Sequence, residues 1–218
     1  RHGEIYVIEA NPRASRTIPF VSKAIGIPLA KVATKCAMGI SLAEAGFPHE
    51  IDIDHVAVKV PVFPFDRFPG VHAALGPEMK STGEVMGIDA TLGKAMAKAL
   101  VAGGQRLPQT GGVFISVNDR DKRSAIPIAR QLVELGLELY STAGTASVLA
   151  RNDIPAWTLA RISQGKRPTV IDLMKDGEIG MLINTPSGYR PRRDEIRIRS
   201  EAIARGIPLI STVAGAQA

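Results

Sequence analysis

The sequence predicts an α/β fold in two regions, and the second contains a parallel sheet flanked by helices on both faces. From residue 113 onward, short apolar runs alternate with helical patterns, which is typical of strands joined by crossover helices in a parallel sheet. Residues 1–105 instead mix helices with extended segments in an α+β pattern. A stretch rich in glycine lies between them at 103–112, so we predict domains at 1–105 and 106–218.

Composition indicates a folded protein of a reducing compartment. The 218 residues are 45% hydrophobic and 22% charged, which excludes wholesale disorder. Cys36 is the single cysteine, so no intrachain disulfide can form, and no apolar run is long enough for a membrane span. We therefore expect a cytoplasmic protein without a membrane partner. Since Arg1 is not an initiator methionine and no signal sequence follows it, we expect a piece of a longer polypeptide.

Apolar periodicity and turn residues define the elements of the first region. Pro61 and Pro64 lack amide donors, so they restrict their segment to a sheet edge or an extended stretch. A glycine- and proline-rich stretch at 69–87 is expected to be an ordered loop. The other predicted elements are a buried strand at 4–10, two helices within 19–38 separated by Gly26-Ile27-Pro28, the edge segment at 55–65, and a helix at 89–102 capped by Asp89 or Thr91.

In the second region strands and helices alternate. The predicted strands or extended segments are 113–117, 137–141, 156–162, 179–184 and 208–210. The predicted helices are 121–135, a short one from Gly144 to about Asn152, 169–175 and 192–205.

Basic residues are concentrated in one run. The net charge is +6, and residues 190–199 contain five arginines. Such a run can meet phosphate or nucleic acid. Because no aromatic stacking residues accompany it and Ile196 and Ile198 lie among the charges, we interpret it as a solvated amphipathic helix and expect no nucleic-acid partner.

The strongest chemical signal follows the first predicted strand. Glu9 and Asn11 alternate onto one face of that strand, and their carboxylate and amide oxygens are hard ligands suited to Mg²⁺ or Mn²⁺. Arg13 and Arg16 follow at once, and arginine can neutralise phosphate oxygens beside such a metal. This combination favours phosphoryl-transfer chemistry over a structural ion pair at a strand end.

Residues 9–16, Glu-Ala-Asn-Pro-Arg-Ala-Ser-Arg, resemble the C-terminal end of an ATP-grasp domain. Together with Thr17-Ile18-Pro19-Phe20 and the motifs at 68–70 and 75–87, the whole chain resembles the large chain of carbamoyl phosphate synthase, beginning in the half that phosphorylates carbamate.

The resemblance implies that Glu9 and Asn11 bind Mg²⁺ or Mn²⁺. It also implies that Arg13 and Arg16 are catalytic and bind the phosphates of the substrate ATP and of the carbamoyl phosphate product. Its implied partners are a glutamine amidotransferase small subunit and the rest of the large chain. Since most of the ATP-grasp domain would precede Arg1, this piece alone is not expected to be active.

A second set of polar residues follows the predicted strands of the later region. Ser141-Thr142-Ala143-Gly144-Thr145 joins a strand to a helix, so backbone N–H groups and threonine hydroxyls could bind an anion there. Other polar residues end neighbouring strands, and a parallel sheet would bring them to the same edge. They are Ser116 and Asn118, Lys122 at the start of the next helix, Arg161, and Asn184 with Thr185.

This half resembles the methylglyoxal-synthase-like domain, which serves as the allosteric domain of the same synthase. The resemblance implies binding of a nucleotide effector such as UMP or IMP by Lys122, Thr142, Thr145, Arg161, Asn184 and Thr185. Two alternatives remain open: a lyase of the methylglyoxal synthase type, or a stand-alone regulatory module that binds a phosphate ligand. No histidine follows Gly112, which disfavours the lyase because that chemistry uses assisting histidines.

Overall fold

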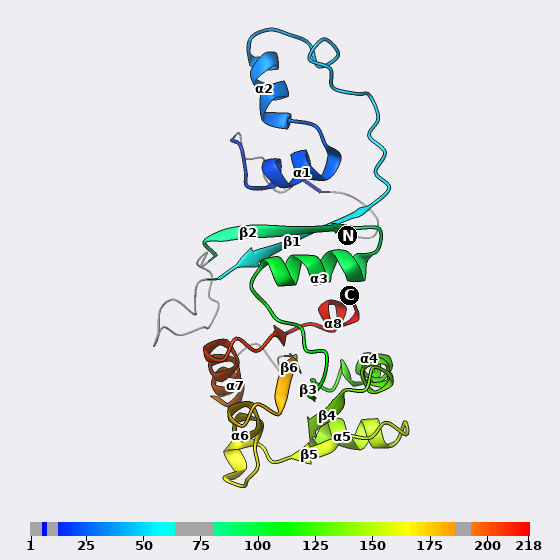
Figure 1. Ribbon diagram of the computed structural model, residues 1–218, viewed down its shortest axis with the longest axis vertical. Coiled ribbons are helices and arrows are strands. Elements are labelled where there is room, and N and C mark those ends of the chain that lie inside the picture. The colour runs from blue at the N-terminus through cyan, green and yellow to red at the C-terminus, as the bar shows by residue number, and fades with distance from the viewer. Residues whose placement is uncertain (1–5, 8–12, 64–80, 186–192) are drawn as a thin grey trace.

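The computed structural model describes residues 6–7, 13–63, 81–185 and 193–218 (Figure 1). Its first described helices are α1, Thr17–Ile25, and α2, Leu29–Ala37, which confirms the predicted helix pair. Gly26 ends α1 with a φ of 70°, a left-handed conformation that favours glycine. The predicted strand at 4–10 lies almost wholly outside the described residues.

A small antiparallel sheet follows, and one of its strands was not predicted. β1, Val56–Val62, pairs with β2, Gly83–Asp89, so the part of the predicted loop from residue 83 onward is a strand. The helix α3, Leu92–Ala102, packs on this sheet and is capped by Thr91, whose hydroxyl accepts a hydrogen bond from Lys94 N.

Gly87 explains why the second strand was missed. A Cβ at this position would clash with the backbone of Ala95 and Ala99 in α3, so the helix packs directly on the strand backbone. Both alanines are fully buried. Glycine here reflects close approach of two elements, whereas in the sequence it suggested a loop.

The second region is a five-stranded sheet in which every neighbouring pair is parallel, as predicted. The strand order is β5-β4-β3-β6-β7. The strands are β3, Gly112–Ser116; β4, Glu138–Thr142; β5, Trp157–Leu159; β6, Ile179–Asn184; and β7, Leu209–Ile210. The helices are α4, Lys122–Glu134; α5, Ala143–Ala150; α6, Val170–Lys175; α7, Arg193–Ala204; and α8, Val213–Gln217, with a 3₁₀ turn at Ile162–Gln164.

Helices cover both faces of the parallel sheet. Along β3, Val113 and Ile115 belong to a core that includes residues of α4 and α5, with α8 packed against it. Phe114, between them, belongs to the core formed with α6 and α7. This alternation is the period of two expected for a strand buried on both faces.

The strand order places a switch point between β3 and β6. The chain runs outward from β3 through β4 to β5, then returns to β6 on the other side of β3 and continues to β7. In open parallel sheets, ligands bind beyond the carboxyl ends of the strands at such a point. The boundary predicted at 105/106 falls between the end of α3 and the start of β3 and stays a prediction.

Candidate effector site

A cavity of about 520 Å³ opens at the carboxyl ends of β3, β4 and β6. A cavity of this size accommodates a small organic ligand. All of the predicted effector residues line it: Lys122, Thr142, Thr145, Arg161, Asn184 and Thr185. The sheet therefore brings together residues that lie up to 63 positions apart in the sequence (185 − 122).

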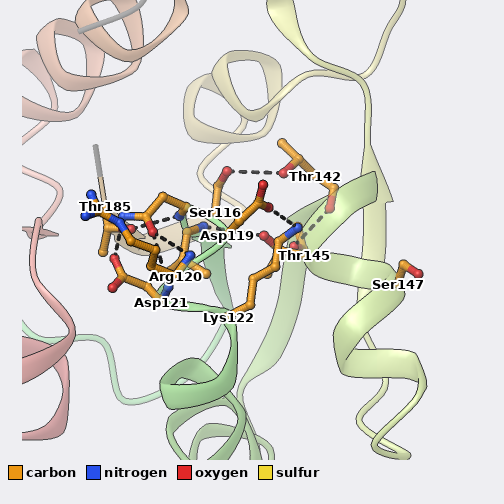
Figure 2. A network of polar contacts seen from close by, with 12 residues as sticks. Ser116, Asp119, Arg120, Asp121, Lys122, Thr142, Thr145, Ser147 and Thr185 are labelled. Carbon is orange, nitrogen blue, oxygen red and sulfur yellow. Dashed lines mark hydrogen bonds and ion pairs between the residues drawn. The ribbon is translucent and has the colours of Figure 1, made fainter. Parts of the chain in front are cut away.

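One wall of the cavity is the connection from β4 to α5 (Figure 2). Thr142 caps α5 with extended backbone, and its hydroxyl lies 3.1 Å from the Ser116 hydroxyl at the end of β3. Thr145 is buried, and its Oγ1 accepts a hydrogen bond of 3.4 Å from the Val117 amide. Because the first amides of a helix have no acceptors within it, the N-terminus of α5 offers donors to an anion.

The β3–α4 loop is held by Asn118. Its side-chain Oδ1 accepts from the amides of Arg120 and Asp121 at 2.9 and 3.1 Å, and its Nδ2 donates to Asp121 Oδ2 at 2.7 Å. The Asn118 amide donates to Thr185 Oγ1 at 3.0 Å. These bonds fix the loop against the end of β6, so the start of α4 has a defined position beside the cavity.

Lys122, the first residue of α4, brings a positive charge to the N-terminus of α5. Its Nζ forms an ion pair of 2.6 Å with Asp119 (Figure 2). A Cβ on Gly144 would come within 3.4 Å of this Nζ, so the ammonium lies against the first turn of α5. A bound anion could meet the helix N-terminus and the lysine together.

The floor of the cavity comes from β6. Asn184 is only 4% exposed, and its Nδ2 donates to the Ser116 carbonyl oxygen at 3.2 Å. Its Oδ1 is buried without a hydrogen-bond partner among the described residues. A buried acceptor in this state is costly, so it marks a place where a ligand donor is favourable.

The opposite wall carries charges of both signs. Arg161 lies on the segment after β5, and the neighbouring Ser163 amide donates to Asp194 Oδ2 of α7 at 3.0 Å. Arg193, Asp194 and buried Glu195 also line the cavity. The basic run was interpreted as a solvated helix, yet the first turn of α7 faces the candidate site.

Sequence reasoning missed these α7 residues and also Asp119 and Arg120 of the β3–α4 loop. No strand or turn signal marks them as site residues, because their position depends on how α7 and the loop pack around the sheet. The proximity of Asp119 to Lys122 at i,i+3 was the one signal available in the sequence.

Of the four residues predicted for ATP and metal, the structure describes the two arginines, and neither lines the cavity. Arg13 and Arg16 are exposed just before α1, with Arg16 at its N-cap. Glu9 and Asn11 fall outside the described residues. Within the described ranges, no group of three or more histidine, cysteine, aspartate or glutamate side chains could hold a metal ion. In the same ranges, every helix is too short or too polar to cross a membrane.

Two family models match separate parts of the chain. The MGS-like domain model matches residues 124–211, which span the parallel sheet from α4 to β7. The model of the carbamoyl-phosphate synthase L chain, ATP binding domain, matches residues 1–45.

Curated relatives match the whole chain. It is 51% identical over 218 residues to the carbamoyl phosphate synthase large chain of Methanoculleus marisnigri, covering 100% of this chain and 20% of that one. The large chain of Nostoc sp. is 49% identical over 215 residues, covering 99% of this chain and 19% of the relative. Over its whole length, the chain is therefore similar to a part of the carbamoyl phosphate synthase large chain.

The chain spans about one fifth of these large chains. A separate C-terminal section of the carbamoyl phosphate synthase large chain from Methanocaldococcus jannaschii is 46% identical over 228 residues, covering 100% of this chain and 37% of that section. The crystal structure of methylglyoxal synthase from Elizabethkingia anophelis NUHP1 gives a TM-score of 0.43 at 11% identity, covering 51% of this chain and 77% of the other. The assignment of an MGS-like fold rests on the family model and the parallel sheet.

Proposed function

We propose that the cavity binds a phosphorylated effector, such as UMP or IMP, and that this chain is the regulatory C-terminal part of a carbamoyl phosphate synthase. One observation carries the proposal: Lys122, Thr142 and Thr145 converge with Gly144 on the N-terminus of α5 inside a single cavity. Hydroxyl donors, backbone amides and an ammonium together are the groups that recognise a phosphate dianion.

The other residues of the cavity suit the rest of a nucleotide. Asn184 Oδ1 could accept a hydrogen bond from a sugar hydroxyl, and Arg161 could contact a phosphate or a base edge. Asp194 and Glu195 favour a ligand whose far end carries hydrogen-bond donors and no further negative charge. A phosphomonoester with a polar body fits these groups better than a compact inorganic anion does.

In the whole synthase, we propose that ATP drives formation of carbamoyl phosphate from bicarbonate and glutamine-derived ammonia for arginine and pyrimidine synthesis. Glu9 and Asn11 would hold Mg²⁺ or Mn²⁺, with Arg13 and Arg16 on the phosphates. A glutamine amidotransferase small subunit would supply the ammonia, and the enzyme would be cytoplasmic. Effector binding would then bias the ATP-grasp half through a coupling free energy between the two sites.

Calorimetric titration of the 218-residue chain with UMP and IMP tests the effector site. The variant Thr142→Ala removes a hydroxyl from the cavity and should weaken binding about tenfold. Ser147→Ala is the matched control, because it removes an exposed hydroxyl from the same helix outside the cavity. Equal weakening by both variants, or no nucleotide binding by a folded sample, would count against the proposal.

A separate assay addresses the lyase alternative. We expect no methylglyoxal from dihydroxyacetone phosphate, because the described cavity contains no histidine. Turnover that Thr142→Ala abolishes would favour a lyase over a regulatory site.

A further inference from the structure

Asp119 forms a close ion pair with the lysine that the proposed phosphate site depends on. Its Oδ1 lies 2.6 Å from Lys122 Nζ (Figure 2). The Lys122 side chain is 23% exposed, whereas that of Asp119 is 92% exposed. The Lys122 side chain is therefore largely surrounded by protein, whereas the Asp119 side chain is surrounded mainly by water.

The burial of Lys122 makes a counter-ion favourable. A partly desolvated ammonium is less stable without an anion than one in bulk water. Asp119 supplies that anion within the chain itself. The exposed Asp119 carboxylate keeps most of its hydration, so water can stabilise its charge when it separates from Lys122.

The loop that carries Asp119 is held by hydrogen bonds that do not involve the Asp119 carboxylate. Asn118 holds the amides on the far side of Asp119, those of Arg120 and Asp121, and is itself bonded to Thr185. Release of Lys122 thus needs a change of side-chain rotamer rather than a rearrangement of the loop.

From this geometry we propose that Asp119 is an internal anion that competes with the ligand phosphate for Lys122. The inference rests on the proposed function of the cavity. A phosphate at the N-terminus of α5 takes the position facing Lys122 Nζ, and its negative charge displaces the Asp119 carboxylate from Lys122. Asp119 lowers the affinity of the site, and so raises the effector concentration at which it fills.

Phosphate titration of Asp119→Asn tests this competition. The variant keeps the size of the side chain but removes its charge, so inorganic phosphate should bind about two- to fivefold more tightly. The matched control is Glu134→Gln, which removes the same charge at the far, exposed end of α4 and should leave the dissociation constant unchanged.

Lysine labelling separates competition from general charge repulsion. In the ligand-free protein, Asp119→Asn should speed acylation of Lys122, measured by mass spectrometry, and leave exposed Lys31 of α2 unaffected. Tighter phosphate binding without faster labelling of Lys122 would overturn the competition, because Asp119 would then act on the ligand directly.

The binding outcomes also separate the two proposals. Equal dissociation constants for the wild type and Asp119→Asn would overturn the role of Asp119 and leave the anion site intact. Binding of phosphate and nucleotide by neither protein would overturn the effector site and the inference that rests on it.

Discussion

Asn184 and Ser116 are joined across neighbouring strands although 68 positions separate them. The Asn184 Nδ2 donates to the Ser116 carbonyl oxygen at 3.2 Å, and the Thr185 amide donates to the same oxygen at 3.2 Å. The floor of the cavity is therefore part of the sheet's own hydrogen bonding, so we expect a change at Asn184 to affect stability as well as the proposed ligand binding.

We expect Asn184→Asp to destabilise the protein by about 2 kcal/mol at pH 7, because a buried carboxylate would face the Ser116 carbonyl without a donor. Burial raises the pKa of the new carboxyl in the folded state. The loss of unfolding free energy therefore grows as pH rises above about 3.9, the ordinary pKa of aspartate, and is smallest at pH values near or below that pKa. Urea unfolding at several pH values measures it. Asn184→Ala is the control, and a similar pH dependence in that variant would contradict the explanation.

Gly87→Ala should cost about 2 kcal/mol or more of unfolding free energy, since the added methyl group would clash with the α3 backbone. Gly83→Ala lies on the same strand with no atom within 4 Å of the added Cβ. It should change stability by no more than about 0.5 kcal/mol. Denaturant unfolding of the two variants compares them directly, and similar losses would mean that strand propensity outweighs the clash.

Gly144→Ala should separate binding from stability. The new Cβ would lie 3.4 Å from Lys122 Nζ, a tolerable contact, and alanine has a higher helix propensity than glycine. We expect an unchanged or slightly raised unfolding midpoint but phosphate binding weakened several-fold, because the methyl group occupies space at the anion position. Unchanged binding would place the anion away from Gly144.

The start of α6 should contribute to the pH dependence of stability. Hydrogen bonds from the Thr169 amide and hydroxyl, both 2.8 Å, hold the pKa of Asp172 below its ordinary value. A lowered folded pKa means that this stabilisation is present above about pH 3.9 and is lost as pH falls through the lower folded value.

Thr169→Ala removes one of these donors, so its stability deficit should be largest at neutral pH and smaller in acid. Thr169→Ser retains the hydroxyl and is the control. Thermal unfolding from pH 3 to 7 provides the comparison, and a deficit that is constant over this range would disprove the role of Asp172.

Much of the parallel sheet could be predicted from the sequence. Apolar runs between turn residues marked the strands, and β6 was predicted with the observed bounds, Ile179–Asn184. The gathering of Thr142 and Asn184 at one edge follows from parallel pairing, because that pairing puts all carboxyl ends on the same side.

The missed features depend on contacts between distant elements. β2 contains two glycines, and one of them, Gly87, suggests a loop until α3 is seen to pack on the strand at that position. Arg193 and Asp194 belong to a run of charges that is typical of a solvated helix, and only the placement of α7 brings them to the cavity. Local patterns carry no information about such long-range proximity.

The Ser116 carbonyl oxygen accepts hydrogen bonds from both Asn184 and Thr185, so the cavity forms only when the sheet has its native pairing. Neither the Asn184 nor the Thr185 contact exists until β3 and β6 have paired, so an unfolded chain has no comparable site for an anion. By mass action, a ligand that binds the native state alone raises the melting temperature of this half in proportion to the logarithm of its concentration. Saturating ligand could therefore rescue variants of the sheet that are too unstable to isolate without it.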